Sequence, residues 1–109
     1  MKEAMRLRIL KFVVDGQSIK KDPSCDFKGL VPGTKGYLEA HFRFSDEWKN
    51  CKKAAVFTAL GKEHAVPLVN GKCEIPEKAL TWRTFSVKAA GIRDGYRITT
   101  NKVEVLQNG

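Results

Sequence analysis

The sequence YLEAHFRFSDEWKNCKKAAVF, residues 37–57, predicts two β-strands joined by a short crossover. Apolar and polar side chains alternate up to position 44, which is the two-residue period of a strand with one face in a core. The run SDEW then breaks the alternation, and Ser45 is a residue type that can cap a single helical turn. Trp48 supplies a large apolar side chain where the chain would pass from one sheet to another. The alternation resumes after it, which predicts a second core strand.

Short strand patterns bounded by turn residues recur along the rest of the chain. The Asp-Gly pair at 15–16 and the Asn-Gly pair at 70–71 are typical of tight hairpins, and the first hairpin is predicted at a sheet edge. Residues 54–75 predict a three-stranded meander, in which Pro67 indicates an edge or bulged middle strand. Pro76 opens a helical turn. The predicted strands cover residues 6–14, 17–19, 37–44, 54–60, 64–69, 72–75, 84–91 and 96–106.

These patterns predict an all-β fold, an antiparallel sandwich of about seven or eight strands with one or two short helical turns. The 109 residues are the size of a single domain, 1–109, with residues 1–5 as a tail. Residues 22–36 form the one long loop, which either carries binding function or is an Ω-like connection packed on its own apolar side chains. The predicted core residues are Phe12, Leu38, Phe42, Phe44, Trp48, Phe57, Leu68, Ile75, Leu80, Phe85, Val87 and Val103.

The three cysteines predict reduced thiols. They form no CxxC pair, so neither a disulfide framework nor a zinc ribbon is indicated. Cys73 alternates with Ile75 and is predicted to be a small core residue, whereas Cys25 and Cys51 lie in polar segments, which favours exposed positions. The sequence shows no signal-peptide pattern and no apolar run of membrane-spanning length, so we expect assembly in the cytoplasm and no membrane partner.

The net charge of +8 raises the question of nucleic-acid binding. The basic residues are spread along the chain and are not interleaved with the aromatics of a stacking platform. A diffuse positive surface favours solubility or an acidic protein partner over a specific nucleic-acid site. We therefore expect only weak, salt-sensitive contact with DNA.

No catalytic constellation can be assembled from the sequence. His41 and His64 occupy polar strand positions without metal-ligand spacing, and no nucleophile, phosphate-binding or dinucleotide-binding motif is present. The adjacent acids Asp46 and Glu47 fit the first turn of a helix, where they favour its dipole. The sequence therefore predicts a protein that is not an enzyme and needs no cofactor and no metal.

Five segments together resemble a family of small immunoglobulin-like β-sandwich domains in structural proteins of phages and prophages of Gram-positive bacteria. The segments are FVVDGQSI, YLEAHFRFSDEWKNCKKAAVF, VPLVNGKCEIPEKAL, FSVKAAG and RITTNKVEV, in this order within residues 10–106. The shared features include the Ser-acid-acid-Trp crossover and the Ile-Thr-Thr-Asn close. The chain departs from the family in the 22–36 loop and in the insertion IRDGY at 92–96.

The resemblance implies a virion component or attachment module of a head, tail or baseplate. Its expected partners are other virion proteins, including further copies of itself, and its expected location is the bacterial cytoplasm during assembly and then the virion.

Two surfaces are candidates for binding. Arg6, Arg8, Lys20 and Lys21 on the first hairpin are a docking edge for an acidic protein surface, or they only keep an edge strand from aggregating. Trp82 and Tyr96, near the two ends of the last strand pair, are a glycan-stacking platform for a host cell surface, or Trp82 covers an open end of the sandwich.

Overall fold

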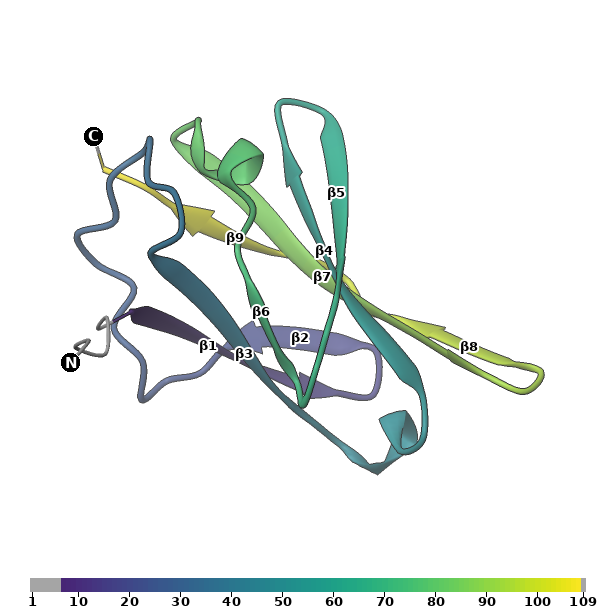
Figure 1. Ribbon diagram of the computed structural model, residues 1–109. Coiled ribbons are helices and arrows are strands. Elements are labelled where there is room, and N and C mark those ends of the chain that lie inside the picture. Colours follow the sequence, from purple (N-terminus) through teal and green to yellow (C-terminus); the bar gives the residue numbers. More distant parts are fainter. Residues whose placement is uncertain (1–6, 109) are drawn as a thin grey trace, which may run out of the picture.

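Nine strands and two single-turn 3-10 helices make up the computed structural model, which describes residues 7–108 (Figure 1). The strands form two sheets packed face to face, which confirms the predicted all-β sandwich. The elements are β1 (Arg8–Asp15), β2 (Ser18–Lys21), β3 (Leu38–Phe44), η1 (Asp46–Trp48), β4 (Lys52–Ala59), β5 (Lys62–Pro67), β6 (Lys72–Glu74), η2 (Glu77–Leu80), β7 (Thr84–Arg93), β8 (Tyr96–Thr99) and β9 (Val103–Leu106).

Sheet A has the strand order β2-β1-β3-β6, and sheet B the order β5-β4-β7-β8 with β9 also pairing β7. Every strand pair is antiparallel except β1 and β3, which run parallel with Phe12 opposite Phe42. The prediction of purely antiparallel pairing is wrong at this point. A parallel pair needs a connection of a dozen or more residues, and here β2 and the 22–36 loop provide it.

The predicted meander over residues 54–75 is also wrong, because its third strand belongs to the other sheet. β5 pairs with β4 at the edge of sheet B, with Pro67 at the end of the ladder, as its missing N–H requires. The chain then crosses to sheet A, where β6 pairs with β3. The Asn-Gly turn lies against β3, since the Phe42 N–H donates to the Gly71 carbonyl at 2.8 Å.

The segment predicted as one strand over 96–106 is two strands, β8 and β9. The break lies at Asn101, whose side-chain Oδ1 accepts a hydrogen bond from the Ile19 N–H at 2.9 Å. The Asn101 N–H in turn donates to the Gln17 carbonyl at 3.0 Å. Asn101 therefore joins the β2 edge of sheet A to sheet B and closes one side of the sandwich.

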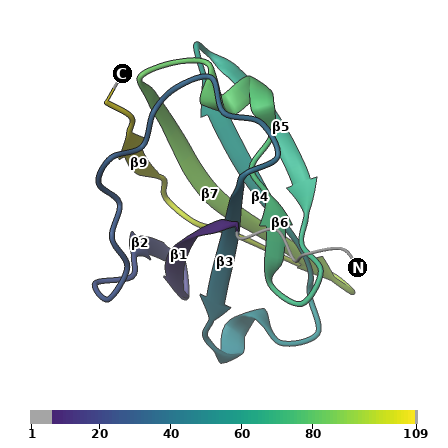
Figure 2. The same cartoon turned by 60° about the vertical axis from the view of Figure 1, so that its left-hand side comes forward.

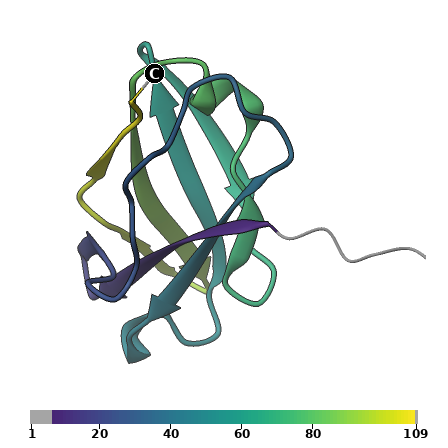
Figure 3. The same ribbon diagram turned by 90° about the vertical axis from the view of Figure 1, so that its left-hand side faces the viewer.

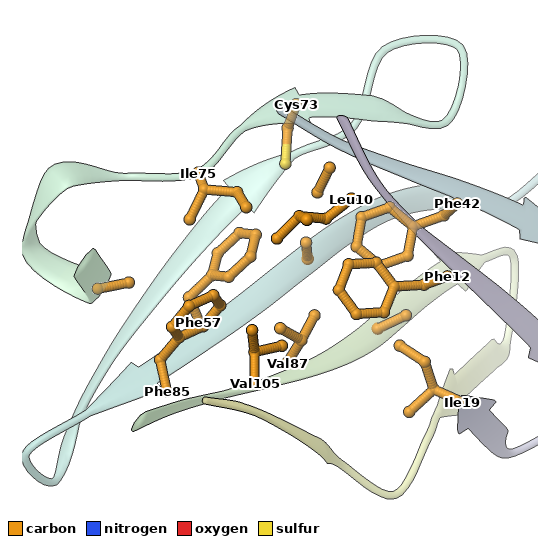
Figure 4. Close-up of a cluster of buried hydrophobic side chains, with 14 of the residues drawn as sticks. Leu10, Phe12, Ile19, Phe42, Phe57, Cys73, Ile75, Phe85, Val87 and Val105 are labelled. Atoms are coloured by element: carbon orange, nitrogen blue, oxygen red, sulfur yellow. The ribbon is translucent and has the colours of Figure 1, made fainter. Parts of the chain in front are cut away.

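Most of the predicted core residues are buried between the sheets, among them Phe12, Phe57 and Phe85 (Figure 4). Phe44, Leu68 and Val103 are only partly buried. The 22–36 loop adds Leu30, which is 2% exposed. The loop passes β9 and η2 before it enters β3, and the Gly33 N–H donates to the Leu80 carbonyl at 2.8 Å (Figures 2 and 3). The part of the loop around Leu30 thus has the packing of an Ω-like connection.

The crossover from β3 to β4 is organised by Trp48, which is fully buried as predicted. Its indole Nε1 donates to the Gly16 carbonyl at 2.8 Å, and its ring lies 5.0 Å from that of Phe44. The predicted cap is wrong, because the Ser45 hydroxyl makes no capping bond to η1. It accepts from the Gly16 N–H at 2.9 Å and donates to Glu47 at 2.6 Å, which lowers the pKa of that carboxyl. The crossover and the first hairpin are therefore tied together.

Because Gly91 of β7 has no side chain, the Trp48 ring can pack directly against it. A Cβ at this position would lie 2.9 Å from two carbons of the ring. We expect Gly91→Ala to lower the free energy of unfolding by about 1–3 kcal/mol through overpacking. Urea denaturation checks this, with Trp48→Phe as a second background in which the smaller ring relieves the clash. Equal costs of Gly91→Ala in both backgrounds would contradict the packing argument.

Candidate interaction surfaces

The predicted docking residues do not form one free basic cluster among the residues that the structure describes, and Arg6 lies outside them. The Arg8 guanidinium donates to the carbonyls of Asp26 and Lys28 at 3.0 and 2.7 Å. The Lys21 ammonium lies 5.2 Å from the centre of the Phe27 ring. Arg8 and Lys21 thus hold the 22–36 loop against the first hairpin, whereas Lys20 is exposed.

The edge position of this hairpin is confirmed, because β2 is the first strand of sheet A. An edge strand offers unpaired backbone groups to a partner, but the Ile19 N–H of β2 already donates to the Asn101 side chain. Docking through the hairpin stays a prediction. Lys20 is the cleaner place to test it, since a change at Arg8 would also release the loop.

Trp82 and Tyr96 cannot form a single glycan platform. They flank opposite ends of β7, a strand of ten residues that spans about 30 Å. The Tyr96 ring is covered by the Arg93 guanidinium at 4.3 Å, and its hydroxyl donates to the Glu47 carbonyl at 3.1 Å. Tyr96 therefore packs the β7–β8 hairpin onto the crossover.

Trp82 itself is 49% exposed and lines a hollow of about 500 Å³ together with Arg83, Gln107 and Asn108. Gln107 was not singled out from the sequence, yet it is 1% exposed and its Nε2 donates to the Trp82 carbonyl at 2.6 Å. Its buried Oε1 has no hydrogen-bond partner within residues 7–108. An exposed indole beside amide groups is a combination suited to a sugar or a peptide.

The outer face of sheet B carries a shallow apolar trough that the sequence reasoning missed. Its floor includes alanines from three strands. Ala54 of β4 lies opposite Ala90 of β7, and Ala65 of β5 lies one step along the same face, opposite Val56. Alanine side chains are short, so the floor lies below the neighbouring Ile92, which is 50% exposed. We call this surface, of about 400 Å³, the alanine trough; it is lined by Lys52, Lys53, Ala54, Ala65, Pro67, Ala90, Gly91 and Ile92.

A second depression, of about 680 Å³, opens beside the crossover where the two sheets diverge. We call it the lysine hollow; it is lined by Phe42, Phe44, Ser45, Asp46, Trp48, Lys49, Cys51, Lys52, Lys53, Pro67, Leu68, Asn70 and Gly71. Lys52, Lys53 and Pro67 belong to both depressions, which therefore meet at the start of β4 and the end of β5.

The lining of the lysine hollow is predominantly basic. The lysine hollow brings together Lys49, Lys52 and Lys53, and Asp46 is the one acidic residue in its lining. Outside the depressions, the outer face of sheet A carries close pairs of polar groups, and the outer face of sheet B carries the ion pair of Lys88 and Glu63 at 3.7 Å. On sheet A, the His41 Nε2 lies 2.7 Å from the Glu39 carboxylate. The Arg43 guanidinium lies 3.8 Å from the Asp22 carboxylate.

The cysteines are free thiols, as predicted. Cys73 is buried as predicted, whereas Cys51, expected to be exposed, is 8% exposed beneath the crossover. Burial raises the pKa of the Cys73 thiol from 9.0 to about 12, with smaller contributions from the carboxylates of Glu39 and Glu74. The unfolded thiol ionises near pH 9 while the folded one keeps its proton, so this group destabilises the fold as the pH rises from 9 towards 12.

We expect Cys73 in the native protein to react slowly with the thiol reagent DTNB at pH 8, because only the thiolate attacks. Cys25 is half-buried and should react much faster. Single Cys25→Ser, Cys51→Ser and Cys73→Ser variants assign the phases, and all three thiols should react rapidly in urea. A fast native phase that disappears in Cys73→Ser would contradict the burial of this thiol.

No group of three or more His, Cys, Asp and Glu side chains within residues 7–108 is placed to hold a metal ion. None of the helical segments in that range has the length and apolar character needed to cross a membrane. Comparison with known protein families, curated proteins and solved structures found no match for the chain. The resemblance to phage structural domains is therefore still a prediction, and a function has to be argued from the surface.

Proposed function

We propose that the chain is a non-enzymatic interaction module of a phage or prophage particle, which docks to another structural protein of that particle. The observation that carries the proposal is the alanine trough on the outer face of sheet B, with exposed Ile92 at its side. Contiguous apolar surface that is rimmed by polar groups is typical of protein interfaces.

The lining of the two depressions supports a binding role over a catalytic one. Neither lining includes a histidine or a pair of carboxylates, the groups on which acid-base catalysis most often depends. The close pair of His41 and Glu39 lies on the other sheet, outside both depressions.

The assignment to a virion rests on the resemblance, whose motifs coincide with parts of the fold that have a clear structural task. The SDEW segment of the resemblance forms the crossover around Trp48, and the ITTN segment contains Asn101, which joins the sheets. Because these motifs have structural tasks, they support a fold like that of the family but say little about a binding partner. Association of the chain with a virion therefore has to be tested.

Association with particles is the test of this function. We expect the tagged chain to co-purify on a density gradient with particles released by the bacterium that encodes it. Ile92→Glu, in the alanine trough, should reduce incorporation at least about tenfold, since it places a charge in an apolar contact. Ile9→Glu is the matched control, because Ile9 is 36% exposed on the outer face of sheet A. A chain absent from particles, or equal incorporation of both variants, would overturn the proposal.

A second candidate function is glycan binding, which the exposed Trp82 favours through its place beside Arg83, Gln107 and Asn108. In this case the purified protein should sediment with cell walls of the host and lose this property in Trp82→Ala. Tyr96→Ala is the control, since the Tyr96 ring is covered by Arg93. Equal sedimentation of the two variants would remove this candidate.

A further inference from the structure

We propose that the docking partner presents an acidic segment with a large apolar side chain, which inserts into the alanine trough while its carboxylates lie at the lysine hollow. The inference rests on the proposed docking function and names the chemistry of the partner. It is carried by the continuity of the two depressions at Lys52, Lys53 and Pro67.

The alanine trough determines the apolar part of the segment. Its volume of about 400 Å³ lies within the range of binding pockets, and its floor exposes methyl groups of Ala54, Ala65 and Ala90. A branched or aromatic side chain that covers these methyl groups removes apolar surface from water on both partners. Pro67 at the rim has no backbone N–H, so the contact depends on side chains rather than on an added strand.

The lysine hollow determines the charge of the segment. Lys49 and Lys52 are exposed there. Lys53 is held by its own contacts, with its ammonium donating to the Cys51 carbonyl at 3.2 Å and lying 5.4 Å from the Phe44 ring. Three ammonium groups around an opening with a single acidic residue, Asp46, favour a carboxylate-rich partner.

Charge also selects between possible occupants. If two copies docked through this same face, Lys52 of one copy would lie against lysines of the other. Repulsion between these like charges opposes such a dimer. Nucleic acid would satisfy the lysines but would find alanines where base stacking needs aromatic side chains. An acidic protein segment with an apolar anchor satisfies both depressions at once.

Binding of designed peptides tests the inference on the intact protein. The probe is a short fluorescein-labelled peptide with a Leu-Phe pair flanked on both sides by Asp-Glu. Matched peptides replace Leu-Phe by Ser-Ser, or Asp-Glu by Asn-Gln or Lys-Arg, and a short single-stranded DNA completes the set. We expect the acidic apolar peptide to bind at least about tenfold more tightly than each of the others, and amide chemical shifts to change at Ala54, Ala90 and Lys52.

Charge reversal then locates the contact. Lys49→Glu with Lys52→Glu should weaken binding of the acidic apolar peptide at least about tenfold. Lys20→Glu with Lys78→Glu changes the net charge equally at exposed positions outside both depressions, and should weaken it less than about twofold. Tighter binding of DNA or of the basic peptide, equal effects of the two double variants, or shift changes confined to other surfaces would overturn the inference.

These outcomes are separable from those of the particle experiment. Peptide binding in the alanine trough by a chain that is absent from particles would overturn the proposed virion function alone. Loss of particle incorporation in Ile92→Glu without any preference for acidic peptides would overturn only the chemistry of the partner.

Discussion

Replacing Trp48 with alanine is expected to lower the free energy of unfolding by about 3–5 kcal/mol, the range for removing a large aromatic side chain from a core. The Trp48 side chain is fully buried at the point where the chain leaves sheet A for sheet B, and its ring contacts Phe44 and Gly91. Its indole N–H also holds the Gly16 carbonyl of the first hairpin. A domain of this size has a total stability of about 5–15 kcal/mol, so the variant should be close to unfolding.

Two further variants show which part of Trp48 matters. Trp48→Phe keeps an apolar ring but leaves the Gly16 carbonyl without its donor, which should cost about 1–3 kcal/mol. Trp82→Ala removes the same side chain from a position that is 49% exposed and should change stability by less than about 0.5 kcal/mol. Urea titrations monitored by circular dichroism give all three values. A Trp48→Ala variant as stable as Trp82→Ala would refute the role of the crossover.

The sequence was sufficient to predict most of the strands, the two-sheet class and most of the core, because these depend on local alternation. The buried positions of β3 and β4 can be read directly from apolar side chains two residues apart. The position of Trp48 was predictable for a related reason, since a large apolar residue in a polar segment has to be buried somewhere. Its hydrogen bond to Gly16 was not, because the two residues are distant in sequence.

Strand partnership was less predictable, because it depends on contacts between distant segments. An Asn-Gly pair indicates a tight turn at 70–71, and the structure has one, but the turn joins strands of different sheets. The parallel pairing of β1 with β3 follows from the path of the 22–36 loop, whose sequence carries no periodic pattern. Long-range hydrogen bonds such as that between Asn101 and Ile19 decide these questions.

The sequence contained an indication of the alanine trough, but it was overlooked because only the core-facing positions of the strands were considered. In β4 and β7 the positions between core residues are also apolar or small at Ala54 and Ala90, which departs from the polar outer face of an ordinary sandwich strand. That departure indicates a second covered face. The strand register was needed to bring these residues together with Ala65 and to place Lys52 at their border.

The outer faces of the two sheets differ in the side chains that they present. Sheet A presents the ion pair of Arg43 with Asp22 and the close pair of His41 with Glu39. Sheet B presents small apolar side chains bordered by lysines. Because ion pairs occur on both outer faces, including Lys88 with Glu63 on sheet B, the apolar floor of the alanine trough is the feature for which the proposed partner would select this face.

Replacing Phe42 with alanine is expected to cost about 3–5 kcal/mol as well, because its ring is central to the aromatic row of sheet A. Phe42 is 8% exposed, and its ring is stacked on that of Phe12 at a centroid distance of 5.2 Å (Figure 4). The centre of the Phe44 ring lies 6.1 Å from that of the Phe42 ring. Phe12 and Phe42 are opposite each other across the parallel pair β1–β3. Removing the Phe42 ring should therefore leave a cavity and also weaken the parallel pairing of β1 with β3.

Phe42→Leu should cost less than about 1.5 kcal/mol, since it keeps most of the apolar volume. Tyr37→Ala, at an exposed position directly before β3, controls for removal of an aromatic ring from the same segment and should be nearly neutral. Thermal and urea denaturation of the three variants measure the differences. A cost of less than about 1 kcal/mol for Phe42→Ala would contradict the place of this ring in the core. It would also mean that Phe42 is not a rigid part of the lining of the lysine hollow.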